Sequence, residues 1–314
     1  MDMITSMKFS AILVHPLTLI SLICGALTYI GSFIAWASNA DYSYLPASEV
    51  KQLQVENQSV PALLRPWIGN KQLGLAIIVP ALGEHADAPG LPGYLRRELN
   101  EAGWATLALT PPSLLASKPP IGLTDSEPEP EPAQQNVSAN SKQLNRSAQS
   151  TAAASTTSIA LSAQQTLVQQ QQDFMLASMA QLDALGKHFA GKRMLIVMGD
   201  SANLIIELLA SKRLPMPDLM VIVNPYSELE SANKALPEKL AALAIPVLDI
   251  QSKDGTAASI ATQVQRRSSA PANAPTRYSQ QVLALDLTLE VAWDNSLELI
   301  EGFVSRINKA YPNG

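Results

Sequence analysis

The sequence contains one cysteine, Cys24, and only three histidines, His15, His85 and His188, among 314 residues. The cysteine lies in the first apolar stretch, so the rest of the chain has neither a disulfide nor a thiolate metal site. No His-x-x-x-His pair and no carboxylate cluster with the spacing of metal ligands occurs. Since a glycine-rich phosphate loop is also missing, we predict neither a metal nor a cofactor.

The chain also lacks an excess of basic residues. It contains 22 Lys and Arg residues and 27 Asp and Glu residues, which gives a net charge of −5. A protein that binds phosphate backbones needs a basic stripe, often with aromatic residues between the charges, and the sequence has none. We therefore expect no nucleic acid as a partner, and the pattern leaves the oligomeric state open.

The first apolar stretch covers residues 9–37, after Lys8. Small residues at Ser38 and Ala40 fit a signal-peptidase site that ends at Ala40. The stretch is longer than the h-region of a typical signal peptide, which has roughly 7–15 residues. It is also long enough to span a bilayer, which takes about 20 residues. We expect residues 1–40 to be either a cleaved signal peptide or a retained anchor in the inner membrane. Either way, the domain of residues 41–314 would be exported to the bacterial periplasm.

Residues 113–160 have a composition unlike the rest of the domain. They contain Glu127-Pro-Glu-Pro-Glu-Pro132 and then a tract rich in Ser, Thr, Asn, Gln and Ala. Such a segment has too few apolar residues to build a core. Because it separates a predicted strand from a predicted helix, we interpret it as a disordered low-complexity insertion within one domain.

Outside that insertion, short apolar runs alternate with helical patterns. The buried strands are predicted at Leu73–Pro80, Trp104–Thr110, Met194–Met198, Asp218–Asn224 and Ile245–Ile250, with a last strand at Val282–Val291. Two earlier strands are predicted at Leu53–Asn57 and Leu63–Trp67, the second at a sheet edge because of Pro66. Helices are predicted at Gly93–Ala102, Leu161–Phe189, Asn203–Lys212, Leu229–Leu243 and Asn295–Lys309, the fourth interrupted at Pro237. Residues 255–274 are predicted to form a loop without regular secondary structure.

This alternation predicts the α/β fold class, with a doubly wound and mostly parallel sheet. In such a sheet the segment Met194-Leu-Ile-Val-Met-Gly-Asp-Ser-Ala-Asn203 stands out. A buried strand, a turn at Gly199, Ser201 and a following helix are typical of the nucleophile elbow Gly-x-Ser-x-Gly, here with Asn203 in place of the second glycine. We expect Ser201 at the apex of the turn. The alternative is that Ser201 only caps a helix.

The order of elements resembles the α/β-hydrolase superfamily over roughly residues 50–312. The loop Pro80-Ala-Leu-Gly-Glu-His85 is similar to the His-Gly-x-Gly-Glu-His loop of monoglyceride-lipase-like members, with Pro80-Ala81 in place of His-Gly. Leu99–Thr106 and Asn224-Pro-Tyr226 resemble an uncharacterised bacterial family within the superfamily. The resemblance implies that the backbone N–H groups of Leu82 and Ala202 stabilise an oxyanion, and that Asp254 is the acid of a triad.

A serine hydrolase needs a nucleophile, a histidine base and an acid that orients the base. Ser201 is the candidate nucleophile, and Asp254, or else Asp249, is the candidate acid. The base should follow the last strand, but no histidine occurs after His188. His85 could serve from the oxyanion loop, although we expect it to brace that loop.

Asp200 and Asp294 are weaker candidates for the base. A carboxylate with a pKa near 4 is a poor base at neutral pH. Without an effective base, the hydroxyl of a serine stays protonated and is a poor nucleophile.

Three functions remain open. The first is a non-catalytic pseudo-enzyme that binds a ligand or partner, such as a small ester or a lipid-like molecule. The second is a serine hydrolase of ester substrates, with Ser201 as nucleophile and an unorthodox base. The third is an envelope scaffold whose insertion carries the interactions. The missing histidine favours the first.

Overall fold

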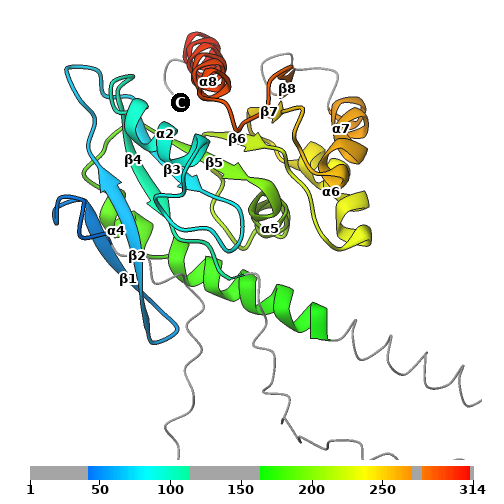
Figure 1. Cartoon of the computed structure of the whole chain (residues 1–314), viewed down its shortest axis with the longest axis horizontal. Coiled ribbons are helices and arrows are strands. Elements are labelled where there is room, and N and C mark those ends of the chain that lie inside the picture. The colour runs from blue at the N-terminus through cyan, green and yellow to red at the C-terminus, as the bar shows by residue number, and fades with distance from the viewer. Residues whose placement is uncertain (1–41, 114–162, 271–277, 312–314) are drawn as a thin grey trace, which may run out of the picture. The chain divides into compact units, whose positions relative to one another are not determined.

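One sheet of eight strands runs through the computed structural model, which describes residues 42–113, 163–270 and 278–311 (Figure 1). The strand order is β1-β2-β4-β3-β5-β6-β7-β8. The strands are β1 (Val50–Val55), β2 (Gln58–Arg65), β3 (Gly74–Val79), β4 (Trp104–Leu109), β5 (Lys192–Met198), β6 (Leu219–Val223), β7 (Val247–Gln251) and β8 (Tyr278–Val282). The predicted fold class is confirmed.

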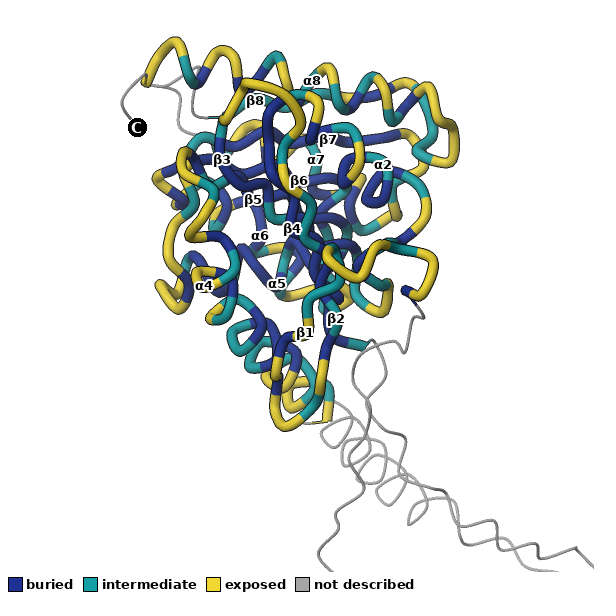
Figure 2. Tube along the Cα trace, turned by 90° about the vertical axis from the view of Figure 1, so that its left-hand side faces the viewer, coloured by how far each residue is buried: buried dark blue, intermediate teal, exposed yellow. Residues whose placement is uncertain are grey.

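Strands β3 to β8 pair in parallel, whereas β2 is antiparallel to both β1 and β4. Helices on both faces bury the central strands, so their sequences are continuous apolar runs with no polar face. Strand β6, Leu-Met-Val-Ile-Val, is buried at all five positions. Figure 2 shows the central strands as the most buried part of the molecule.

The helices form two layers around the sheet. They are α2 (Leu91–Glu98), α4 (Leu182–Gly186), α5 (Gly199–Ala210), α6 (Glu230–Ala242), α7 (Ala257–Ser269) and α8 (Glu290–Ala310), with a further helix at residues 163–179. Helices α2 and α8 pack on one face, where Leu95 and Phe303 join one apolar cluster. Helices α5 and α6 pack on the other face, together with residues of the segment 163–186.

Five predictions about the elements are wrong. The single helix predicted at Leu161–Phe189 is divided into a helix at residues 163–179 and the short helix α4. Strand β2 ends before Pro66 and pairs on both sides, so it is not an edge strand. Helix α6 runs through Pro237, whose ring is buried, and this packing offsets the lost backbone hydrogen bond. Residues 257–269 of the expected loop form α7, and the last strand is Tyr278–Val282 instead of Val282–Val291.

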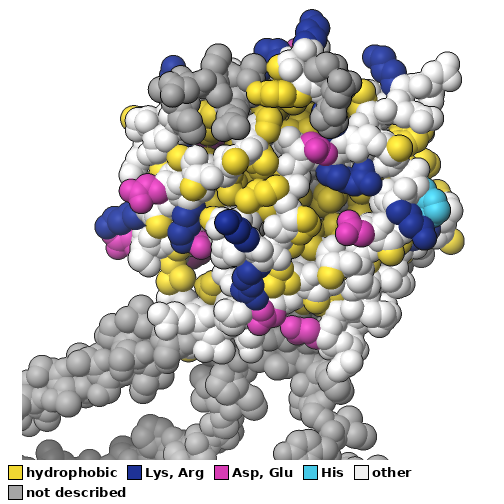
Figure 3. All heavy atoms as spheres, turned by 180° about the vertical axis from the view of Figure 1, so that it is seen from behind, with side chains coloured by type: hydrophobic (Ala, Val, Ile, Leu, Met, Phe, Trp, Pro, Cys, Tyr) yellow, Lys and Arg dark blue, Asp and Glu magenta, His cyan; other side chains and the backbone are white. Residues whose placement is uncertain are grey.

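The signal or anchor expected in residues 1–40 lies outside the described residues, as does nearly all of the expected insertion at 113–160; both stay predictions. Among the helices that the structure describes, none has the length and apolar content to cross a bilayer. Figure 3 shows the back of the molecule, where basic and acidic side chains are interspersed with apolar ones.

Candidate active site

The turn after β5 is the centre of the candidate site. Strand β5 ends at Met198, and α5 begins at the next residue, Gly199. Gly199 has a φ of 58°, which lies in the left-handed region that favours glycine. Gly199 therefore forms the apex of the turn, directly between the strand and the helix. The prediction that Ser201 occupies the apex is wrong, because Ser201 lies two residues further on, in the first turn of α5.

The space beside Gly199 leaves little room for a side chain. A Cβ atom added there would lie 3.1 Å from the Cβ of Ala81 and 3.5 Å from Cε1 of Tyr226. The first of these distances is tighter than an ordinary van der Waals contact. The loop after β3 and the segment after β6 thus pack against the apex. In a hydrolase with a nucleophile elbow, the nucleophile occupies this position.

Ser201 is completely buried within the domain. Its hydroxyl has no hydrogen-bond partner among the described residues. A catalytic serine is normally within hydrogen-bond reach of its base. Neither His85, Asp254 nor another base is within such reach of Ser201 in the part of the chain that the structure describes.

Asp200, between the apex and Ser201, carries the most informative contacts of the site. One oxygen of its carboxylate, Oδ1, accepts a hydrogen bond from the backbone N–H of Leu82 at 2.8 Å and another from that of Ser201 at 3.0 Å. Donors of an oxyanion hole lie about 2.7–3.1 Å from the developing negative oxygen. Both distances fall in this range, so backbone N–H groups hold one carboxylate oxygen of Asp200 at the distances at which they would hold an oxyanion.

The predicted oxyanion donors are therefore only partly in place. The N–H of Leu82 does point at a negative oxygen, but that oxygen belongs to the chain itself. Ala202 is fully buried in the first turn of α5, whose leading N–H groups have no partner within the helix. The N-terminus of α5 favours the negative charge of Asp200 through the same groups.

Several acidic groups raise one another's pKa around this turn. Burial raises the pKa of the Asp200 carboxyl, although three backbone hydrogen bonds act against the rise, and nearby Glu228 raises it further. Burial also raises the pKa of Glu84, and the charge of Asp200 adds to this effect. Burial and these carboxylates raise the pKa of Tyr226 to about 12. Acidic side chains thus cluster around this turn, and burial together with their mutual repulsion disfavours ionisation of each.

Replacing Asp200 with asparagine is expected to change how stability depends on pH. Since the folded-state pKa of Asp200 is raised, its contribution to stability is fully present below the unfolded pKa of about 4 and is lost as pH rises through the folded pKa. Asparagine keeps an acceptor oxygen for Leu82 but does not titrate. The melting temperature of Asp200→Asn relative to wild type should therefore rise between pH 4 and pH 8. An unchanged difference across this range would contradict the assignment.

Asp254, the predicted acid, links two loops at the end of the sheet. It accepts a hydrogen bond from the hydroxyl of Ser252 at 2.5 Å and from the backbone N–H of Leu287 at 3.1 Å. Leu287 lies between β8 and α8, where the resemblance places the catalytic histidine. The carboxylate is thus at the expected end of β7, but it holds a loop in place of an imidazole.

His85 lies in the loop between β3 and α2, as predicted. Its ring packs edge-on against Tyr42, with 6.3 Å between the ring centroids. Its Nδ1 is buried and has no hydrogen-bond partner within the described ranges. The same loop is held by Asp87, which pairs with the buried Arg96 at 2.9 Å, so an ion pair that the sequence did not reveal supplies the brace.

The other carboxylates considered as acid or base have structural partners. Asp294 accepts a hydrogen bond from the hydroxyl of Tyr94 and so joins α8 to α2. Asp249 is fully buried and forms an ion pair with Arg266 at 2.8 Å. Burial, and the neighbouring Asp249 carboxylate, raise the pKa of Tyr278, which donates to that carboxylate. Both carboxylates thus take part in contacts that join elements of the fold.

A cavity of about 250 Å³ opens beside the start of α5. Leu82, Asp200, Asn203 and Glu228 line it, together with residues of the helix at 163–179. Within the described ranges, no group of three or more His, Cys, Asp or Glu side chains is placed to hold a metal ion. The lining therefore combines two acidic side chains, Asp200 and Glu228, with apolar ones.

The sequence predicted a turn at Gly199 and offered Asp200 as a weak base, but it did not reveal that Gly199 is the apex or that Asp200 binds the loop after β3. The signal was present, because Gly199 follows directly after an apolar strand and glycine is the residue that best tolerates a left-handed turn. The Gly-x-Ser motif instead predicts the apex at Ser201, two residues further along the chain. The side chain of Asp200 folds back on the loop after β3, and no local pattern predicts such a contact.

The fold and the turn after β5 define an α/β-hydrolase-fold protein. The chain belongs to the family described as "Protein of unknown function (DUF3530)", which matches residues 35–306. A search of curated proteins gave no significant match.

Solved structures of similar fold include three esterases. Est1E from Butyrivibrio proteoclasticus has a TM-score of 0.53 and 10% identity, covering 82% of this chain and 98% of its own. An esterase of Pyrococcus furiosus has a TM-score of 0.53 and 9% identity, covering 88% of this chain and 98% of its own. The esterase domain of a Rhodothermus marinus protein has a TM-score of 0.50 and 10% identity, covering 82% of this chain and 97% of its own. At these identities the likeness concerns the fold.

Proposed function

We propose that this protein keeps the α/β-hydrolase fold without ester hydrolysis and acts by binding a ligand or partner. The proposal rests on the contacts of the Asp200 carboxylate. Its Oδ1 accepts hydrogen bonds from the backbone N–H groups of Leu82 and Ser201 at 2.8 and 3.0 Å. A substrate carbonyl would have to displace this carboxylate before its own oxygen could be stabilised.

Two further features support the proposal. The apex of the elbow is Gly199, which has no side chain that could attack a carbonyl carbon. The chain also has no histidine after His188, whereas a triad histidine follows the last strand in this fold. Loss of a triad member alone typically costs several orders of magnitude in rate.

The alternative is an esterase-like serine hydrolase in which Ser201 attacks an ester and an unorthodox base assists. The similar solved structures are esterases, which motivates this alternative. It requires a movement of α5, because the Ser201 side chain is completely buried. We therefore favour the non-catalytic role.

Exposure of the purified full chain to a fluorophosphonate probe tests the proposal. We expect no covalent labelling of wild type between pH 6 and pH 9, because the probe reacts only with an activated serine. A characterised serine esterase labelled in parallel controls for the probe, and circular dichroism shows that the protein is folded. Labelling of wild type that disappears in Ser201→Ala would overturn the proposal and establish the alternative.

A further inference from the structure

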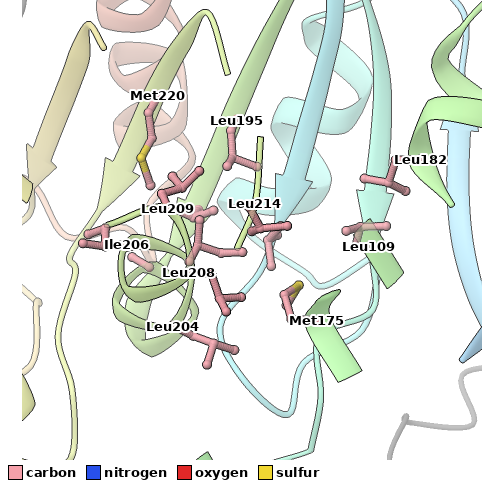
Figure 4. Packing of buried hydrophobic residues seen from close by; sticks show 14 of the residues in the cluster. Leu109, Met175, Leu182, Leu195, Leu204, Ile206, Leu208, Leu209, Leu214 and Met220 are labelled. Carbon is pink, nitrogen blue, oxygen red and sulfur yellow. The ribbon is translucent and has the colours of Figure 1, made fainter. Parts of the chain in front are cut away.

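A second and larger cavity, of about 490 Å³, lies away from the elbow. Its walls are apolar and come from several elements: Leu75 and Ile77 of β3, Leu195 of β5, Leu209 of α5, and Leu176 and Met179 of the helix at residues 163–179. Figure 4 shows Leu195, Leu209 and Leu214 grouped together, with Leu182 of α4 set apart from them. The volume and lining are typical of a pocket for a small organic molecule.

This cavity is distinct from the site at the start of α5. Leu209 lies in the last turn of α5, nine residues after Asp200, which corresponds to about 13 Å along a helix. The strand residues that line the cavity lie within the first four positions of β3 and β5, whereas the elbow follows the end of β5. A ligand in this cavity would therefore not touch Asp200.

Positive charge exceeds negative charge in the lining. Arg193 and Arg213 both line the cavity, against a single carboxylate, Asp183. The guanidinium of Arg193 donates to the backbone carbonyls of Phe189 at 2.8 Å, Gly186 at 3.2 Å and Gly191 at 3.4 Å. These carbonyls orient the guanidinium but do not neutralise its charge.

The second arginine has a carboxylate partner outside the lining. Arg213 pairs with Asp173 at 2.9 Å, but both side chains are more than a third exposed. Exposed pairs of this kind contribute little, so Arg213 can exchange partners at low cost. The cavity thus presents an apolar interior together with two guanidinium groups.

We propose that this cavity binds a medium-chain fatty acid, with the alkyl chain inside and the carboxylate paired with Arg193 or Arg213. The apolar walls match the alkyl chain, and a guanidinium forms charge-assisted hydrogen bonds with a carboxylate. The inference gives a ligand class to the binding role proposed above and rests on it. Its site is separate from the elbow, so the experiments distinguish failure of this inference from failure of the proposed function.

The test uses a dodecanoic acid that carries a photoreactive diazirine, with the full chain. After irradiation, mass spectrometry should locate the crosslinks in the peptides around Leu176–Met179 and Leu209–Met216. Unlabelled fatty acids should compete, and each methylene added from octanoate to dodecanoate should improve competition about fourfold, since each buries one more CH₂. Dodecanoate should compete better than dodecan-1-ol, dodecylamine or a dodecanoyl monoacyl phospholipid.

A matched pair of variants checks the location. Ala180 is exposed and lines the cavity, so Ala180→Trp should obstruct it and reduce crosslinking about tenfold or more, a loss of about 1.4 kcal/mol. Ala242 is also exposed but lies at the end of α6, away from the lining, and Ala242→Trp should leave crosslinking unchanged.

Three results would overturn the inference. The first is crosslinking of wild type only outside the cavity peptides, which needs no variant to interpret. The second is equal crosslinking of a folded Ala180→Trp. The third is stronger competition by the amine, the alcohol or the phospholipid than by dodecanoate. Fluorophosphonate labelling reports on the start of α5 and does not affect these outcomes.

Discussion

Replacing Asp249 with alanine is expected to lower the free energy of unfolding by about 3–5 kcal/mol. Asp249 on β7 and Arg266 on α7 are both completely buried and are 2.8 Å apart. Without the carboxylate, the guanidinium would keep only neutral acceptors, among them Gln251 at 2.8 Å and the carbonyl of Ser259 at 2.9 Å. A buried charge without a counter-charge is strongly destabilising. Chemical denaturation followed by circular dichroism measures the effect.

Asp254→Ala is the matched control for this prediction. It also removes an aspartate just after β7, but Asp254 is exposed and has no ion pair in the described structure. The loss of its hydrogen bonds to Ser252 and Leu287 should cost about 1 kcal/mol. The double variant Asp249→Ala/Arg266→Met should be more stable than Asp249→Ala alone, because it removes the uncompensated charge. Equal losses in Asp249→Ala and Asp254→Ala would show that the buried pair has no special role.

Replacing Gly74 with alanine is expected to destabilise the domain by at least about 3 kcal/mol, through backbone strain and a steric clash. Gly74 begins β3 with a φ of 137°, and an added Cβ would lie 1.9 Å from the carbonyl oxygen of Lys192. Lys192 cannot easily move away, because its N–H donates to Leu73 at 2.9 Å in the sheet. The thermal or denaturant midpoint of the variant measures this loss.

Gly69 offers a control that separates the clash from the strain. Its φ is 83°, also positive, but an added Cβ would have no atom within 4 Å. Gly69→Ala should therefore cost only the backbone strain, about 1–2 kcal/mol. If Gly74→Ala were no more destabilising than Gly69→Ala, the contact with Lys192 would not be rigid.

The central strands could be predicted because both of their faces are buried. A strand covered on both sides consists of consecutive apolar residues, as in Leu219–Val223, and such a run is visible in the sequence alone. The doubly wound and mostly parallel sheet followed from the alternation of strands and helices. These features depend on hydrophobic burial, which short sequence patterns record well.

Helix α7 could not be predicted because its burial pattern is the reverse of the usual one. Its buried side chains are the polar Ser259, Thr262 and Arg266, whereas Ile260 and Val264 are exposed. A search for an apolar stripe therefore finds no helix that faces a core. The helix packs through the buried ion pair of Arg266, and that partner lies 17 residues earlier in the chain.

The sequence predicted at which end of the sheet the candidate site lies, but not the contacts that its residues make. The loop after β3, the turn after β5 and the acid after β7 do lie at one end of the sheet, because the carboxyl ends of parallel strands meet there. The position of the apex depended on a single φ angle at Gly199. The role of Asp200 depended on a hydrogen bond to Leu82, 118 residues away in sequence. Neither is encoded in a local pattern.

The carboxylate of Asp200 also bears on how this chain could evolve. To hydrolyse esters through its elbow, the chain would need a hydroxyl at Gly199, more room beside Ala81, and an imidazole in place of the Leu287 contact with Asp254. It would also have to remove the carboxylate that pairs with Leu82. On the non-catalytic role proposed above, no single one of these four changes would bring together a nucleophile, a base and a free oxyanion hole. On that proposal, a gain of ester hydrolysis would require several substitutions together, among them one that frees the N–H of Leu82 from Asp200.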